Sequence, residues 1–326
     1  MKGGFRRITA LLHLLAGALL LVSCAVAVSE PEMQDGQKRI AISFDDVPRH
    51  PGGFLTPDQR TATLIDGLRR AGVEQAAFFV TTGNLENDYG QGGEARIVAY
   101  AAAGHVIANH SHSHGWLWNG DAAEYIADLD KAEARLAGRP GKRPWYRFPY
   151  LDEGRDVERR DALRAALTQR GLMNGYVTVD NFDWAIDGLA SKAIEDGRSI
   201  DRAALGKLFV ETIVDTANFN DRIAREMLGR SPAHVLLLHE TDLNALFIVD
   251  LVEGLRADGW TIVTMDEAYA DAIARLEPDT LYLGGGRVTA IAAAAGRDPA
   301  TLVHERTDEA ELERLFEERV IVKAAP

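Results

Sequence analysis

Cysteine is almost absent from this chain, since Cys24 is the single cysteine among 326 residues. A chain with one thiol forms no internal disulfide, and its 46% share of hydrophobic residues is enough for a large core instead. Basic residues are also few: 36 Lys and Arg face 49 Asp and Glu, which gives a net charge of -13. Phosphate-binding surfaces need clustered Lys and Arg, so the partner is expected to be neither nucleic acid nor anionic lipid. The chain lacks a Gly-x-Ser-x-Gly segment, which disfavours a serine hydrolase.

The N-terminal region has no apolar run long enough to predict a membrane span. Residues 1–23 combine a basic start with an apolar stretch over residues 8–22, which is the layout of a secretory signal. Residues 21–24 (Leu-Val-Ser-Cys) are similar to a bacterial lipobox, in which the cysteine becomes the lipidated first residue. We therefore expect an exported protein of the periplasm or cell envelope, anchored in the membrane by a lipid on Cys24. Cleavage after residues 25–27, which would remove Cys24, is the alternative.

Short β-branched or aromatic runs alternate with longer amphipathic segments between residues 39 and 277. Strands are predicted at residues 39–44, 76–80, 105–108, 145–148, 175–179, 234–238 and 260–263. The helices predicted between them include residues 57–71, 94–103, 122–137, 157–170 and 243–257. This alternation is typical of parallel strands joined by crossover helices. The sequence therefore predicts an α/β fold of the distorted (β/α)7 barrel type.

Two regions interrupt the alternation. Residues 185–231 are longer than a simple crossover and contain a predicted helix around 205–216, so we interpret them as an insertion. Residues 278–326 follow the last strand as a C-terminal extension, with a glycine turn at 284–286 and a charged helix near 308–318. The expected organisation is a signal peptide, a linker at residues 24–38, a catalytic barrel at residues 39–277 and this extension.

Acids and histidines follow two of the predicted strands directly. Asp45 and Asp46 come after the strand at 39–44, and a run with three histidines comes after the strand at 105–108. The carboxyl ends of parallel strands are where α/β barrels place their active sites. His110 and His114 are four residues apart and converge on one cation if the segment turns helically, and two imidazoles with one carboxylate suit Zn²⁺ or a similar metal. A solvated Asp-Asp turn and a metal-buffering histidine tract are the alternatives, and His112 is expected to point elsewhere.

Five short motifs occur in order, each at or just after a predicted strand: Ser43-Phe44-Asp45-Asp46, Asn109-His110-Ser111-His112-Ser113-His114, Arg147-Phe148-Pro149-Tyr150, Asp180-Asn181-Phe182-Asp183-Trp184 and Leu236-Leu237-Leu238-His239. Each motif alone is weak, but together they span residues 40–269. In this order they resemble the polysaccharide deacetylases, carbohydrate esterase family four.

The resemblance implies a role for each matching position. Asp46, His110 and His114 would hold a divalent metal, with Zn²⁺ expected and Co²⁺, Ni²⁺ or Mn²⁺ as alternatives. Asp45 would be the general base, oriented by Arg147, and His239 the general acid. The remaining roles are the tuning of His239 by Asp183, an oxyanion contact from the backbone N–H of Tyr150, and an acetyl pocket walled by Trp184 and Leu238.

The resemblance implies hydrolysis of acetyl groups on N-acetylated or O-acetylated sugars or polysaccharide, such as chitin oligomers or peptidoglycan. Carbohydrate is then the substrate partner, and the oligomeric state is left open. One departure from the family pattern is Val47, which stands where the family usually has glycine, so we expect the loop after Asp46 to turn differently. Two other functions stay open: hydrolysis of a non-acetyl or cyclic amide of a small molecule, and non-catalytic glycan binding at the cell surface.

Overall fold

The computed structural model describes residue 1 and residues 36–117, 120–282 and 284–322. The chain separates into Met1–Gln34 and a compact unit Asp35–Pro326, and everything below concerns the described part of the second unit. The predicted signal peptide and Cys24 lie outside the described residues. Among the described helices, none is both long enough and apolar enough to cross a membrane.

The sheet is built from parallel strands, as predicted. Its strand order is β5-β4-β3-β2-β1-β6, and β7 pairs with β1. β6 pairs with β1 along Arg39 to Asp45, whereas β7 and β2 use the beginning and the end of β1. The strands are β1 (Lys38–Val47), β2 (Ala77–Val80), β3 (Val106–Asn109), β4 (Lys142–Tyr146), β5 (Met173–Asn174), β6 (Ala233–His239) and β7 (Trp260–Ile262).

Residues 173–179, which follow α4 (Val157–Gln169), link the two ends of this sheet. Their first part, β5, pairs with β4 through Met173 and Asn174, and six residues later Val179 forms a parallel bridge with Leu236 of β6. The strand predicted at 175–179 was therefore wrong: the regular strand is Met173–Asn174, and within 175–179 only Val179 forms a bridge. This connection gives the sheet the distorted barrel form that the sequence predicted.

Helices surround the sheet, and the five crossover helices lie close to their predicted ranges. They are α1 (Pro57–Arg70), α2 (Gly93–Ala102), α3 (Ala122–Leu136), α4 (Val157–Gln169) and α7 (Asp242–Ala257). α1 begins where expected because Pro57 occupies its first turn and Thr56 forms a capping box with Gln59. The helix predicted around 205–216 is part of α6 (Arg202–Leu228), and the charged helix predicted near 308–318 is α10 (Glu309–Arg319). The structure adds α5 (Asp183–Glu195), α8 (Met265–Ala270) and α9 (Arg287–Ala294).

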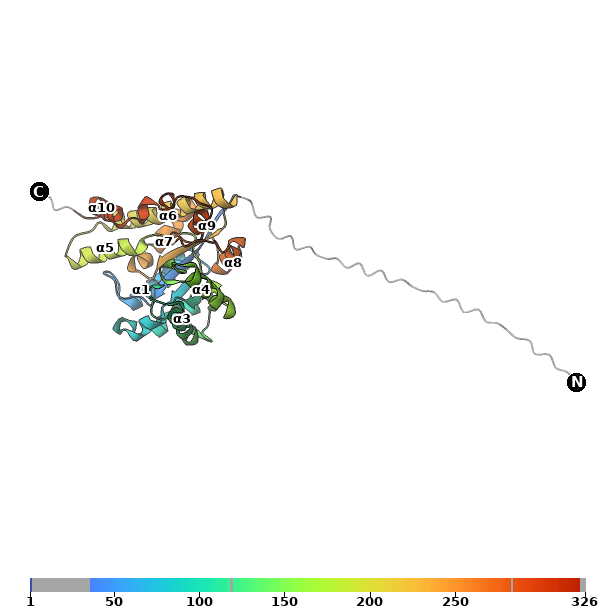
Figure 1. Ribbon diagram of the computed structural model, residues 1–326. Helices are drawn as coiled ribbons and strands as arrows, with labels where there is room; N and C mark the ends of the chain where they lie inside the picture. Colours follow the sequence, from blue (N-terminus) through green and yellow to red (C-terminus); the bar gives the residue numbers. More distant parts are fainter. Residues whose placement is uncertain (2–35, 118–119, 283, 323–326) are drawn as a thin grey trace. The chain divides into compact units, whose positions relative to one another are not determined.

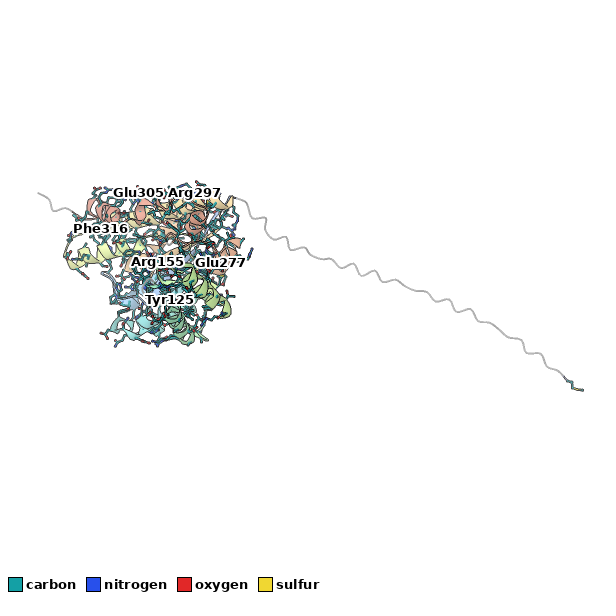
Figure 2. The ribbon with its side chains drawn as sticks, viewed as in Figure 1. Tyr125, Arg155, Glu277, Arg297, Glu305 and Phe316 are labelled. Carbon is teal, nitrogen blue, oxygen red and sulfur yellow. The ribbon has the colours of Figure 1, made fainter. Side chains whose placement is uncertain are left out.

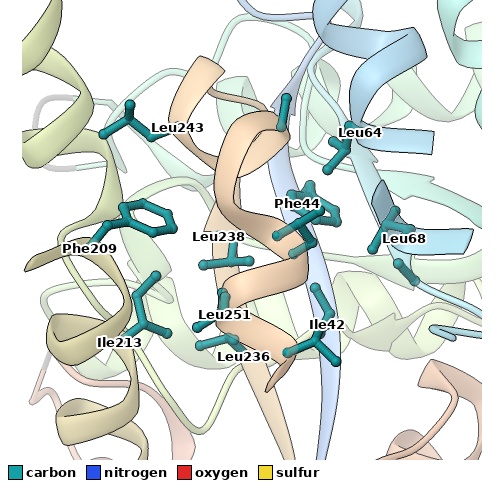
Figure 3. Close-up of a cluster of buried hydrophobic side chains, with 14 of the residues drawn as sticks. Ile42, Phe44, Leu64, Leu68, Phe209, Ile213, Leu236, Leu238, Leu243 and Leu251 are labelled. Atoms are coloured by element: carbon teal, nitrogen blue, oxygen red, sulfur yellow. The ribbon is translucent and has the colours of Figure 1, made fainter. Parts of the chain in front are cut away.

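The main core lies between one face of the sheet and helices α1, α6 and α7. Figure 3 shows strand residues such as Phe44 and Leu238 facing Leu68 and Phe209 from the helices. Fully burying a large apolar side chain contributes about 1.5–3 kcal/mol, so this cluster is a major source of stability. On β6, Leu236 and Leu238 point into this core, whereas Val235 and Leu237 belong to a second cluster on the other face.

The C-terminal extension is part of the packed unit. Helix α10 lies against α5 and α6 (Figure 1) and buries Leu312 and Phe316 in the main core. Phe316 is marked on α10 among the side chains of Figure 2. The extension therefore supports α5 and α6, and α5 begins at a predicted site residue, Asp183.

Candidate active site

One cavity collects most of the predicted site residues at the carboxyl ends of the strands. It has a volume of about 530 Å³, and Asp45, Asp46, His110, His114 and His239 all line it. The sheet register explains part of this arrangement, because Asp45 at the end of β1 pairs directly with His239 at the end of β6. The sequence placed these residues at strand ends, and the fold brings the strand ends together.

The three predicted metal ligands form a compact group. Asp46, His110 and His114 each offer a ligand atom, and these atoms lie within 4.8 Å of one another. Asp46 Oδ1 is 3.1 Å from His114 Nε2 and 3.6 Å from His110 Nε2. Burial opposes ionisation of Asp46, but its contacts with His114 and Arg49 hold the pKa of this carboxyl well below its ordinary value. The group therefore offers one carboxylate and two imidazole nitrogens at a single point.

His110 is held in the form that a metal ligand needs. Its Nδ1 lies 2.9 Å from the carbonyl oxygen of Arg147, so a proton on Nδ1 is donated to that oxygen and Nε2 is left to accept. Burial lowers the pKa of His110 to about 4, despite the opposing charges of Asp45 and Asp46. The imidazole is therefore neutral at pH 7, with a free lone pair toward Asp46.

A left-handed backbone at Asp46 lets two consecutive acids face one cavity. Neighbouring residues on a strand normally point to opposite faces, but Asp46 has φ 65° and turns the chain at this point. Val47 is not among the described residues with positive φ. It is fully buried in the main core and lies beside Val80 of β2. Asp46, and not Val47, takes the left-handed conformation, and a loop after Asp46 that turns differently from the family's stays a prediction.

Arg147 holds the carboxylate of Asp45 in a fixed orientation. Its Nη1 donates to Asp45 Oδ1 at 2.5 Å and to Ser43 Oγ at 2.8 Å. Its Nε donates to the carbonyl oxygen of Gly175 at 2.6 Å, and the guanidinium lies 3.7 Å from the ring centroid of Phe79. Arg147 is completely buried, so these contacts leave it one orientation. The predicted pairing of Arg147 with Asp45 is present, and it leaves Asp45 Oδ2 on the side of His110.

His239 and Asp183 form the second polar pair of the site. Asp183 Oδ1 lies 2.8 Å from His239 Nδ1, and Asp183 Oδ2 accepts from the backbone N–H of His239 at 2.8 Å. Asn244 of α7 donates to the same Oδ2 at 2.6 Å. Burial disfavours the charged imidazole, but the charge and hydrogen bond of Asp183 outweigh it and raise the pKa of His239 to about 9. His239 is therefore protonated at neutral pH in this structure.

Two of the three predicted substrate contacts lie at the cavity, and the third does not. Trp184 and Tyr150 line it, and the ring of Tyr150 packs 4.8 Å from that of His114. Leu238 is fully buried in the main core instead, and Leu237 lines the cavity in its place. The prediction for Leu238 was wrong by one residue, because a strand alternates faces and His239 shares its face with Leu237.

Several groups at the site were not predicted. Arg49 lines the cavity and pairs with Asp46 Oδ2, and Asp180 lines it between Phe182 and His239. Burial raises the pKa of Asp180 to about 6, although the positive charge of His239 acts in the opposite direction. Asp180 opens the fourth motif and could have been proposed from it, whereas Asn244 has no signal in the sequence because only the packing of α7 brings it to Asp183.

His112 lies outside the group, as predicted. Its Nδ1 is 2.9 Å from Thr82 Oγ1 and its Nε2 is 2.6 Å from Lys131 Nζ. The residue is therefore tied to its neighbours on the far side of the loop.

The strand ends of this parallel α/β sheet thus bring together two adjacent acids, the neutral imidazole of His110 and the protonated His239 beside Asp183. Residues 32–169 match the family model "Polysaccharide deacetylase", which confirms the predicted resemblance over that part of the chain. This match covers less than half of the chain, and the region that it covers resembles deacetylases, which hydrolyse carbon–nitrogen bonds other than peptide bonds. No curated protein matches the chain.

Two solved structures illustrate what the chain is similar to. A family 4 carbohydrate esterase from Streptomyces lividans, in complex with acetate, is 21% identical with a TM-score of 0.48, over 72% of this chain and 96% of its own. The peptidoglycan deacetylase PdaC from Bacillus subtilis is 21% identical with a TM-score of 0.45, over 73% of this chain and 92% of its own. Similarity at this level does not extend to substrate.

Proposed function

We propose that this protein is a metal-dependent deacetylase that removes acetyl groups from N-acetylated sugars or from a polysaccharide that contains them. The observation that carries the proposal is that one cavity holds both a ligand group and two proton-transfer groups. The ligand group is Asp46, His110 and His114, and the proton-transfer groups are Asp45 and His239. O-acetyl groups present the same carbonyl to the site, so they belong to the same substrate class.

The donor set fits a divalent cation. Two imidazole nitrogens and one carboxylate oxygen suit Zn²⁺, with Co²⁺, Ni²⁺ and Mn²⁺ as alternatives, and three protein ligands leave positions for water and substrate. The hydrogen bond from His110 Nδ1 to the carbonyl of Arg147 supports this fit because it orients the ring and leaves Nε2 available for the cation. A cation bound there would supply Lewis-acid polarisation of the acetyl carbonyl.

The remaining chemistry belongs to the chain's own side chains. Asp45 has one oxygen held by Arg147 and the other facing the cavity, so it is placed to take a proton from the attacking water. His239 carries a proton at neutral pH and is placed to give it to the departing nitrogen as the amide bond breaks. The products are acetate and a free amine on the sugar.

The other predicted residues serve geometry. Asp183 holds the His239 ring through Nδ1, which directs Nε2 toward the cavity. The backbone N–H of Tyr150 is the predicted donor to the oxyanion of the tetrahedral intermediate. Trp184 and Leu237 line the same cavity and would enclose the acetyl methyl group.

The test is acetate release by metal-stripped protein that is refilled with Zn²⁺, Co²⁺ or buffer alone. The substrates are acetylated chitin oligomers, peptidoglycan and acetyl-xylan. We expect metal-dependent acetate from at least one of them, and an Asp45→Asn protein should keep its metal but lose turnover. Asp66→Asn, at an exposed carboxylate on α1, is the matched control. An Asp45→Asn protein with the original rate would refute the base, and a metal-loaded protein that releases no acetate would refute the function.

We also propose that the protein is exported and anchored by a lipid on Cys24, on the evidence of residues 1–24 alone. Mass spectrometry of the N-terminal peptide from a bacterial host should find an acylated Cys24. A mature chain that begins after Ala27 would contradict the anchor and leave export intact.

A further inference from the structure

A second cavity continues from the candidate active site. It has a volume of about 290 Å³ and shares two of its lining residues, Asp180 and Phe182, with the first cavity. Its other walls come from α6, from Tyr282, Gly284 and Gly285, and from the segment at residues 302–307. These walls lie beyond residues 32–169, the part of the chain that matches the deacetylase family model. The second cavity is therefore built by the insertion and the C-terminal extension of this particular chain.

The lining of the second cavity combines aromatic rings with neutral hydrogen-bonding groups. Phe219 and His304 face each other with ring centroids 5.2 Å apart, and Phe182 and Tyr282 add two more rings. Asn220 is 97% buried at this cavity; its Nδ2 donates to the carbonyl oxygen of Thr216, and its Oδ1 has no hydrogen-bond partner among the described residues.

The charges at this cavity select against an anion. No Lys or Arg is among the described residues that line it, and Asp180 at its junction with the first cavity is an acid. A ligand with apolar ring faces and several hydroxyl donors matches rings, amide oxygen and carboxylate together. A neutral sugar unit has this chemistry.

A different cavity adjoins the active site on its other side but has a different lining. It has a volume of about 270 Å³, shares Trp184 with the active site, and is otherwise lined by aliphatic and charged residues that include Leu189, Lys192, Glu309 and Glu313. Trp184 is the only ring among its lining residues in the described part of the chain. A sugar chain that leaves the active site is therefore better accommodated on the Phe182 side than on the Lys192 side.

We propose that the cavity between Phe182, Phe219, Asn220 and His304 binds a neutral sugar unit adjacent to the unit that is deacetylated. The substrate is then an oligosaccharide or polysaccharide that extends over α6, rather than a single amino sugar. This inference rests on the proposed function, which supplies the neighbouring sugar, and it makes the insertion and the extension determinants of specificity.

The experiment compares N-acetylglucosamine oligomers of one to four units with a small aryl acetate ester. For each protein and each oligomer, the measured quantity is the ratio of kcat/KM for that oligomer to kcat/KM for the ester. In the wild type this ratio should rise with chain length. Phe219→Ala and His304→Ala should each lower the ratio for the tetramer about tenfold through the lost ring contact. Glu313→Gln, in the cavity on the other side, is the matched control and should leave the ratio unchanged.

Equal ratios in the wild type and in both variants would overturn the proposal, and so would a loss confined to Glu313→Gln. Thermal unfolding of each variant shows whether it folds, and having two independent variants keeps the test valid if one does not. If the wild type releases no acetate from any sugar, the proposed function fails. The sugar site is then tested separately by binding of the intact N-acetylglucosamine tetramer to wild type and His304→Ala, where equal affinities would refute it.

Discussion

Two histidines of the candidate site, the buried His110 and the partly buried His239, have opposite pKa shifts. The pKa of His110 is lowered to about 4, whereas that of His239 is raised to about 9. His110 directly follows β3 and His239 ends β6 of the same parallel sheet, and both are largely inaccessible to solvent. Burial alone therefore does not explain the difference between their pKa values. The difference lies in the partner of Nδ1: a neutral carbonyl oxygen of Arg147 for His110, and the carboxylate of Asp183 for His239.

This difference divides the cavity into two functional halves. A metal ligand must offer a lone pair, which a neutral imidazole has, whereas a proton donor must begin protonated. The residue is histidine in both places, and the hydrogen-bond partner of Nδ1 decides whether the neutral or the protonated form is stable. The predictions below test this division by changing one half at a time.

The largest effect is expected in the ligand half. His110→Ala removes one of three ligand atoms, so we expect loss of bound metal and a fall in acetate release on the order of a thousandfold. Metal content by elemental analysis and acetate release are measured on the same sample. His112→Ala is the matched control from the same loop, because its ring contacts Thr82 and Lys131 instead. Equal metal content in both variants would contradict the assignment of His110.

The proton-donor half should respond differently. His239→Ala should keep its metal, since the ring is not among the three clustered ligands, and should lose about a hundredfold in kcat. The loss should be smaller for substrates with a better leaving group, such as an aryl ester, because such a group departs without a proton. An equal loss for amide and aryl ester would show that His239 does not act as the acid.

The comparison also shows what the sequence could predict. Asp45, Asp46, His110 and His114 were found because each follows a strand directly, and parallel strands end at the same edge of the sheet. Leu238 was misplaced because motif order gives no information about which face a residue occupies, and the alternation along β6 selects Leu237. The left-handed conformation of Asp46 was missed because the family pattern directed attention to Val47.

The parts that could not be predicted depend on contacts distant in the sequence. Asn244 reaches Asp183 only because α7 packs beside α5, and the chain from residue 278 supports α5 through α10. Neither contact produces a local pattern. The full length of α6 was readable in part, since Asp201 and Gly229 cap its ends, but its amphipathic signal was strongest near the middle.

A moderate effect is expected on the pH dependence of stability in metal-free protein. The folded pKa of His239 is about 9 and its ordinary value is 6.5, so its contribution is fully present below about pH 6.5 and is lost as the pH rises through about 9. The contribution is about 2–3 kcal/mol. Denaturant unfolding of wild type and Asp183→Asn, each with a chelator, should give a stability difference that shrinks across this window. A difference that stays constant from pH 6 to 9.5 would contradict the raised pKa.

The smallest effect is expected at Arg49, which lies where the two halves meet. Its Nη1 donates to Asp46 Oδ2, so it orients the carboxylate but also places a positive charge beside the predicted cation. Arg49→Gln keeps a donor and removes the charge, and we expect metal affinity to rise a few-fold because unit charges at this range interact by about 1–4 kcal/mol near a surface, most of it screened. Competition with a metal indicator measures the affinity. Arg49→Ala removes the donor as well and should bind more weakly than Arg49→Gln. If Arg49→Gln itself binds metal more weakly than the wild type, orientation outweighs charge repulsion, and Arg49 belongs with the groups that hold Asp46 for the metal.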